Sequence, residues 1–189
     1  MPLPAVPLPA LVGQSMGGST VLGFASKYPD RVTALVMCDT TGSIDDPDII
    51  KAQAEYQKTR PNTGLLDALS PGFRKRDPVH TFLYREVTAL TLRLNNVPAP
   101  APNSAPAPTP PPVRHDVRPV LAKKIPTLIL VGAADALASP AVIEMLHNKM
   151  PGSQFVKIPD AGHSVYFEKP EEFNRTVMGF LKEHMRSSD

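Results

Sequence analysis

The sequence lacks the features that several large classes of protein require. It has a single cysteine, Cys38, which excludes an internal disulfide and a metal site built from several cysteines. No stretch approaches the roughly 20 apolar residues of a membrane-spanning helix, so we expect no membrane association. The 20 Lys and Arg residues nearly balance the 18 Asp and Glu residues, and no basic run is interleaved with aromatic side chains. Nucleic-acid binding therefore has no support in the composition.

The first residues of the chain make a poor secretory signal. No basic segment precedes the apolar residues, and prolines interrupt them. The cytoplasm is therefore the expected location. The chain has 189 residues, of which 42% are hydrophobic, enough for one ordinary domain with a sizeable core.

Proline is unusually abundant, with 23 residues, many of them between Pro98 and Pro112. Such a run cannot donate the backbone hydrogen bonds of a helix or a sheet, and it favours the polyproline II conformation. We expect residues 98–112 to be an exposed connector. A ligand for the aromatic groove of a partner protein is the alternative.

Hydrophobic periodicity predicts an α/β fold with a parallel sheet. Apolar residues ending at Val12 precede a region of helical spacing, and the later elements alternate between strands and helices. This order is typical of parallel sheets covered by helices. The expected core comprises residues 1–42 and 117–189, and residues 43–116 form an inserted helical cap over the sheet. The individual elements are expected at residues 19–28 (helix), 32–38 (strand), 47–59 and 78–92 (helices), 127–131 (strand), 140 onward (helix capped by Ser139), 154–158 (strand) and 170 onward (helix).

The residues Gly13-Gln14-Ser15-Met16-Gly17-Gly18 match the G-x-S-x-G nucleophile elbow. In such an elbow a serine occupies a strained turn between a strand and a helix, and small flanking residues avoid clashes. The helix behind the serine presents its N-terminus, which favours developing negative charge. The pentapeptide also arises by chance, as a plain glycine-rich turn. Its position after an apolar run and before a helix indicates that Ser15 is a nucleophile.

Two further residues complete a candidate triad. Asp135 lies just beyond the strand at 127–131 and so at the carboxyl edge of the sheet, where α/β sites form. There it could accept the Nδ1–H of a histidine. Asp39 follows the strand at 32–38 in the same way and is the alternative acid. His163 lies in the loop after the last strand and could act as general base toward Ser15, whereas the other four histidines lie in the insertion or on helices.

The order Ser, Asp, His is that of the α/β-hydrolases. Nearly the whole chain resembles this superfamily, and most closely its capped carboxylesterases and enol-lactonases. The resemblance implies a serine hydrolase that cleaves small carboxylic esters through an acyl-enzyme, without cofactor or metal. It also implies that the Met16 N–H is one oxyanion donor. Besides the elbow, the matching segments are Tyr-Pro-Asp-Arg-Val at 28–32, Gly-x-x-Asp-x-x-x-x-Pro at 132–140 and Gly-His-x-x-x-x-Glu-x-Pro-Glu-x-Phe at 162–173.

The chain departs from the superfamily at its start, because only 14 residues precede Ser15. Family members carry further strands there, together with a loop that supplies the second oxyanion donor. The expected fold is therefore an α/β-hydrolase sheet without its first strands. Three interpretations follow: a working esterase, a weak or inactive hydrolase fragment, and a non-catalytic binding module. The first remaining strand would expose one edge, so we expect a homo-oligomer.

Overall fold

A parallel sheet forms the centre of the molecule. The computed structural model describes residues 8–60, 64–94 and 113–185. Every pair of neighbouring strands in the sheet is parallel. The carboxyl ends of the strands therefore share one edge of the sheet. In spatial order the strands are β1 (Ala10–Gln14), β2 (Ala34–Cys38), β3 (Thr127–Gly132) and β4 (Gln154–Ile158).

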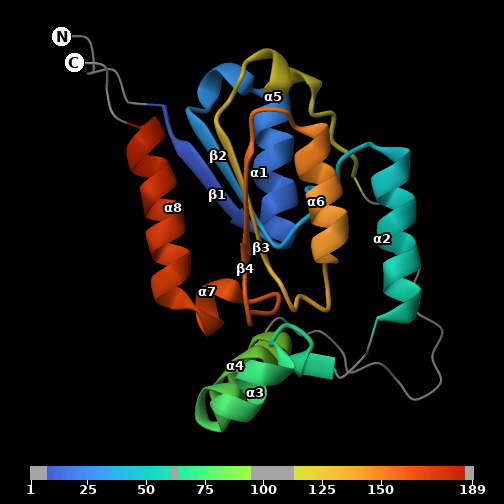
Figure 1. Cartoon of the computed structure of the whole chain (residues 1–189), viewed down its shortest axis with the longest axis vertical. Helices are drawn as coiled ribbons and strands as arrows, with labels where there is room; N and C mark the ends of the chain where they lie inside the picture. Colours follow the sequence, from blue (N-terminus) through green and yellow to red (C-terminus); the bar gives the residue numbers. More distant parts are fainter. Residues whose placement is uncertain (1–7, 61–63, 95–112, 186–189) are drawn as a thin grey trace.

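Helices cover both faces of this sheet (Figure 1). One face packs against α1 (Met16–Lys27), α5 (Arg118–Ala122) and α6 (Pro140–Lys149), and the other packs against α8 (Pro170–His184). All residues of β2 and β3 are buried. Strands covered on both faces are expected to be apolar throughout rather than alternating. The predicted parallel α/β fold is therefore confirmed.

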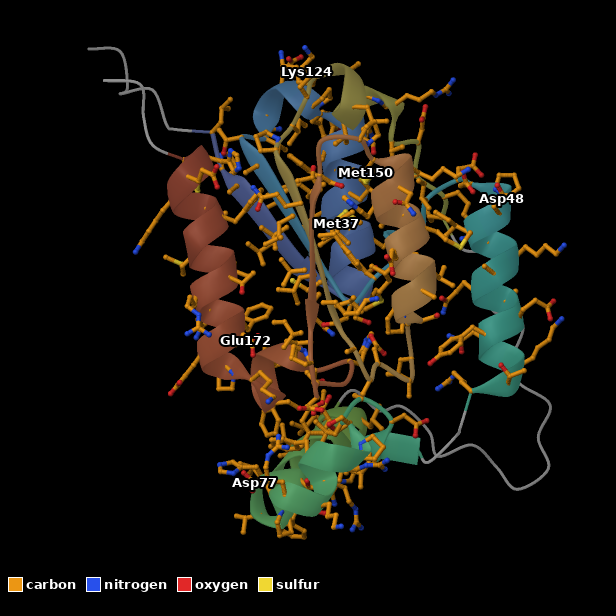
Figure 2. All side chains as sticks on the ribbon, viewed as in Figure 1. Met37, Asp48, Asp77, Lys124, Met150 and Glu172 are labelled. Carbon is orange, nitrogen blue, oxygen red and sulfur yellow. The ribbon has the colours of Figure 1, made fainter. Side chains whose placement is uncertain are left out.

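The side chains of each strand divide between the two faces. In β2, Leu35 and Met37 pack toward α1 and α6, whereas Val36 and Cys38 pack toward α8. Figure 2 shows Met37 among the side chains that fill the centre of the molecule. This division follows from the two-residue repeat of a strand, which places successive side chains on opposite faces.

The described residues of the predicted cap at 43–116 form three α-helices, η2 (Gly64–Leu66) and an isolated bridge between Ile44 and His115. Helix α2 (Pro47–Thr59) packs beside α6, while α3 (Pro71–Arg76) and α4 (Pro78–Leu94) lie beyond the carboxyl ends of the strands (Figure 1). The Asp46 side chain caps α2 by accepting the N–H groups of Asp48 and Ile49, each at 3.1 Å. The predicted connector at 98–112 lies outside the described residues.

The predicted element boundaries differ in detail from those of the structure. The first helix begins at Met16 rather than near residue 19, because Gly17 and Gly18 interrupt the apolar pattern without interrupting the helix. The strand expected at 32–38 begins at Ala34. Five short elements were not predicted, and each is too short to display helical periodicity: η1 (Pro29–Arg31), η2, α3, α5 and α7 (Val165–Glu168).

Among the residues that the structure describes, no helix combines the length and the apolarity that crossing a bilayer requires.

Candidate active site

Ser15 occupies a strained turn between β1 and α1. Its backbone has φ 53° and ψ −120°, in the left-handed half of conformational space that non-glycine residues rarely adopt. A Cβ added at Gly13 would lie 2.3 Å from the carbonyl oxygen of Gly17, so only glycine lets the turn close. At Gly17 a Cβ would meet nothing within 4 Å, whereas at Gly18 it would lie 2.3 Å from Cγ2 of Thr40. The predicted need for small residues therefore holds at Gly13 and Gly18 but not at Gly17.

His163 lies in the loop after β4 and faces Ser15. Its Nε2 atom is 2.8 Å from the Ser15 Oγ atom, and the residue is 7% exposed. The Gln14 side chain donates from Nε2 to the His163 carbonyl oxygen at 2.8 Å, which ties the loop to the elbow. An imidazole at this distance can take the proton of a serine hydroxyl.

Asp135 lies on the far side of the imidazole. Its Oδ2 atom is 2.8 Å from the His163 Nδ1 atom. Its Oδ1 atom accepts the N–H groups of Leu137 and Ala138, at 2.7 and 2.9 Å. The Tyr56 hydroxyl donates to the Asp135 carbonyl oxygen at 2.9 Å. The side chain and the backbone of Asp135 are therefore both fixed, and the structure brings all three predicted triad residues together.

Asp39, the alternative acid, has a different partner. Its Oδ1 atom accepts the Gly132 N–H at 3.0 Å, and the side chain is 1% exposed. Burial, together with the nearby Asp135 carboxylate, raises the pKa of Asp39 well above its ordinary value. A carboxyl group bonded to the backbone of β3 is poorly placed to orient the imidazole. The geometry therefore favours Asp135 as the partner of His163.

Met16 is the first residue of α1. The residue is 83% exposed. The N–H groups of a helix's first turn have no intrahelical acceptor, so they are available to an anion. The Met16 N–H as an oxyanion donor stays a prediction.

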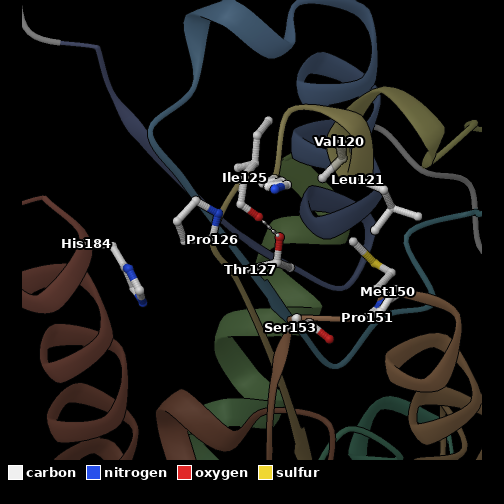
Figure 3. A pocket seen from close by; sticks show the side chains of 11 residues that line it. Val120, Leu121, Ile125, Pro126, Thr127, Met150, Pro151, Ser153 and His184 are labelled. Atoms are coloured by element: carbon white, nitrogen blue, oxygen red, sulfur yellow. Dashed lines mark hydrogen bonds between the residues drawn. The ribbon is translucent and has the colours of Figure 1, made fainter.

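A hollow of about 350 Å³ opens above the Ser15 and His163 side chains. A neighbouring hollow of about 770 Å³ shares Met16 and Ser19 with it and continues along α1 toward His115. A separate hollow of about 560 Å³ lies at the amino ends of β3 and β4, near Thr127 and Ser153 (Figure 3). Its lining contains none of the three triad candidates. Of these three hollows, the first is the one lined by triad candidates, Ser15 and His163.

The sequence did not reveal two residues that support the site, Gln14 and Tyr56. Gln14 is part of the elbow, yet nothing in the motif indicates that its side chain reaches His163. Tyr56 lies on α2, 79 positions from the Asp135 carbonyl oxygen that it contacts. Only the tertiary fold creates these pairs.

The described part of the chain contains no group of three or more His, Cys, Asp or Glu side chains that could hold a metal ion.

The chain is similar to known hydrolases. An sn-1-specific diacylglycerol lipase of Mus musculus is 28% identical over 184 residues, which cover 90% of this chain and 58% of the lipase. A pimeloyl-(acyl-carrier protein) methyl ester esterase of Neisseria meningitidis is 26% identical over 196 residues, which cover 93% of this chain and 70% of the esterase. The structure of a thermophilic esterase from Thermogutta terrifontis, with malate bound, superposes with a TM-score of 0.59 at 29% identity.

The similarity spans most of this chain but less of some relatives. The aligned region covers 91% of the chain and 64% of the Thermogutta esterase, so the chain spans less than two thirds of that esterase and of the lipase. The model of the alpha/beta hydrolase fold family matches residues 6–170. The resemblance inferred from the sequence motifs is confirmed, and the chain belongs to the alpha/beta hydrolase fold family.

Proposed function

We propose that this protein is a serine hydrolase that cleaves carboxylic esters through an acyl-enzyme, with Ser15 as nucleophile, His163 as base and Asp135 as orienting acid. One observation carries the proposal: Ser15 Oγ, the His163 imidazole and Asp135 Oδ2 form a continuous chain in which both contacts are 2.8 Å. A nucleophile in contact with a base, and the base in contact with an orienting group, is the arrangement that activates a serine hydroxyl.

The first half of the reaction forms the acyl-enzyme. Ser15 Oγ attacks the ester carbonyl carbon while His163 Nε2 takes the hydroxyl proton. The oxyanion develops beside the N-terminus of α1, where the Met16 N–H can donate to it. The tetrahedral intermediate then breaks its bond to the alkoxy oxygen, which leaves as the alcohol with the proton from His163.

The second half releases the acid. A water molecule gives a proton to His163 Nε2 and attacks the acyl carbon, and the Ser15 Oγ atom leaves with that proton. Throughout, Asp135 accepts the Nδ1–H of His163, which selects the tautomer with a free Nε2 and stabilises the imidazolium.

Two of the relatives support ester chemistry. The Neisseria relative is named as a methyl ester esterase and the mouse relative as a diacylglycerol lipase. The hollow at Ser15, of about 350 Å³, and the adjoining hollow along α1, of about 770 Å³, suit a small-molecule ester. Residues 43–116 act as a cap in this proposal, since Ser43 and Gln53 line the hollow next to the nucleophile.

Self-association is part of the proposal. Within the described residues β1 pairs only with β2, and Val12 in β1 is 46% exposed. Unpaired strand edges are templates for pairing with a second copy, and a symmetric dimer is the commonest closed solution. We therefore propose a homo-oligomer formed through β1.

Hydrolysis of p-nitrophenyl esters of increasing acyl length tests the proposed activity. The wild-type chain should release p-nitrophenol, and Ser15→Ala should lower kcat to background, because removing the nucleophile of a triad costs about 10⁶-fold. Equal rates for the two chains would point to a non-catalytic binding module, or to a hydrolase fragment without activity.

A further inference from the structure

Glu168 is a buried acidic residue outside the triad that joins two distant segments. It is 6% exposed and lies at the end of α7. Its Oε1 atom accepts the N–H groups of Ser70 and Gly162, both at 2.9 Å. Its Oε2 atom accepts the Ser70 hydroxyl at 2.6 Å. A single carboxylate therefore connects the start of α3 to the residue that precedes His163.

The residue that follows His163 is held by the same part of the insertion. The Ser164 N–H donates to the Ala68 carbonyl oxygen at 2.9 Å. The Ser164 hydroxyl lies 2.8 Å from the hydroxyl of Tyr84 on α4. Of the two chain neighbours of His163, Ser164 is thus bonded directly to residues 68–84, and Gly162 is connected to them through Glu168.

The His163 loop packs closely against the residues that begin α3. A Cβ added at Gly162 would lie 2.6 Å from the Ser70 nitrogen and 2.8 Å from Oε1 of Glu168. Both ring nitrogens of His163 also make contacts of 2.8 Å, Nδ1 with Asp135 and Nε2 with Ser15. Catalysis is sensitive to such placement, since a shift of about 1 Å can cost about 10²-fold in rate.

We propose that Glu168 is a positioning residue, which sets the position of His163 by fastening its loop to the N-terminus of α3. Its effect on catalysis rests on the proposed hydrolase function. Glu168 does not touch the reacting atoms, and it acts through Gly162 and Ser70. One consequence is that α3 and α4 help to determine whether the imidazole meets Ser15. This role is separate from any contact that the two helices make with substrate.

Three variants separate positioning from a general loss of stability. Glu168→Ala leaves the buried N–H groups of Ser70 and Gly162 without their acceptor. Glu168→Gln keeps an oxygen for them. Thr127→Val is the matched control, because it removes a buried hydroxyl that donates to the Ile125 carbonyl oxygen at 2.9 Å, at the opposite end of the sheet.

Two measurements are made on each variant, well below its melting temperature. The first is the second-order rate of Ser15 labelling by a fluorophosphonate. The second is the low-field proton resonance of the His163 Nδ1–H that faces Asp135. Glu168→Ala should slow labelling about 10–100-fold and shift or remove the resonance. Glu168→Gln should stay within about threefold of wild type, a rescue consistent with one net hydrogen bond or less. Thr127→Val should preserve both readouts even if it melts earlier.

The proposal is contradicted if folded Glu168→Ala labels at the wild-type rate with an unchanged resonance, or if Thr127→Val is slowed equally. If Glu168→Ala does not fold, Ser70→Ala replaces it and should slow labelling about 3–10-fold, the effect of one hydrogen bond. Unchanged labelling and resonance in Ser70→Ala would then overturn the proposal. If the wild type itself does not label, the proposed function fails, and the resonance alone decides the role of Glu168.

Discussion

The Oδ2 atom of Asp135 lies 2.8 Å from the Nδ1 atom of His163, and the other oxygen of the same carboxyl group accepts two backbone N–H groups. Asp39, at the end of the neighbouring strand, accepts the Gly132 N–H instead. Two buried acidic residues thus lie close together, but only Asp135 faces the imidazole.

This division predicts different effects for two isosteric variants. Asp135→Asn should lower ester turnover by about 10⁴-fold without unfolding the protein, because an amide in this place favours the wrong histidine tautomer. Asp39→Asn should retain most of the turnover, because the asparagine oxygen can still accept the Gly132 N–H. Steady-state kinetics with circular dichroism as the folding control measures both. The reverse pattern would exchange the roles of the two residues.

Asp39 should make the stability of the protein depend on pH. Its pKa is raised in the folded state, mainly by burial, whereas the unfolded chain has an ordinary pKa of about 3.9. Above that pH the unfolded chain releases a proton that the folded protein retains. The free energy of unfolding should therefore fall as the pH rises from about 4 toward the folded pKa, by up to about 1.4 kcal/mol per pH unit.

Asp39→Asn removes this titration. The free energy of unfolding of the variant, minus that of the wild type, should therefore increase with pH. Urea denaturation of both chains between pH 4 and pH 8 measures the difference. Parallel stability curves would show that Asp39 is already ionised in the folded protein.

Cys38 should be inert in the native protein. Burial is the main cause that raises the pKa of its thiol to about 12, and the residue is 0% exposed. Because the thiolate is the reactive form, labelling by iodoacetamide at pH 8.5 should be negligible when the protein is folded and complete in denaturant. Rapid labelling under native conditions would mean that β2 opens readily.

The exposed edge of β1 should mediate self-association. Wild-type protein at low micromolar concentration should sediment as a dimer or a larger species. Val12→Lys should shift it toward the monomer, because a lysine on a strand edge opposes pairing. Val79→Lys on α4, where Val79 is 73% exposed, is the control for adding a charge elsewhere. A compact wild-type monomer would show that the chain does not pair through β1.

The sequence predicted those strands and helices that are marked by a pattern of neighbouring residues. The run at 127–131 became β3, and Ser139 caps α6 through an oxygen that accepts the Val142 N–H at 3.5 Å. The order Ser15, Asp135, His163 also predicted which residues would meet, because parallel strands carry their following loops to one edge.

The supporting contacts were not predictable in the same way. Glu168 was visible only as part of a motif, and its partner Ser70 is 98 positions away. The choice between Asp135 and Asp39 required the direction of each carboxyl group, which follows from backbone turns such as the positive φ of 51° at Asp39. Such directions depend on packing between segments rather than on any local pattern.

The central claim is that Ser15 is the acylated nucleophile, and active-site labelling tests it most directly. The wild-type protein is incubated with a fluorophosphonate, digested, and mapped by mass spectrometry, with Ser15→Ala and His163→Ala as controls. We expect a single adduct on Ser15, no adduct in Ser15→Ala, and labelling slowed by several orders of magnitude in His163→Ala, which lacks the base. An adduct on Ser19, Ser139 or Ser164, or none on the folded wild-type protein, would contradict the account.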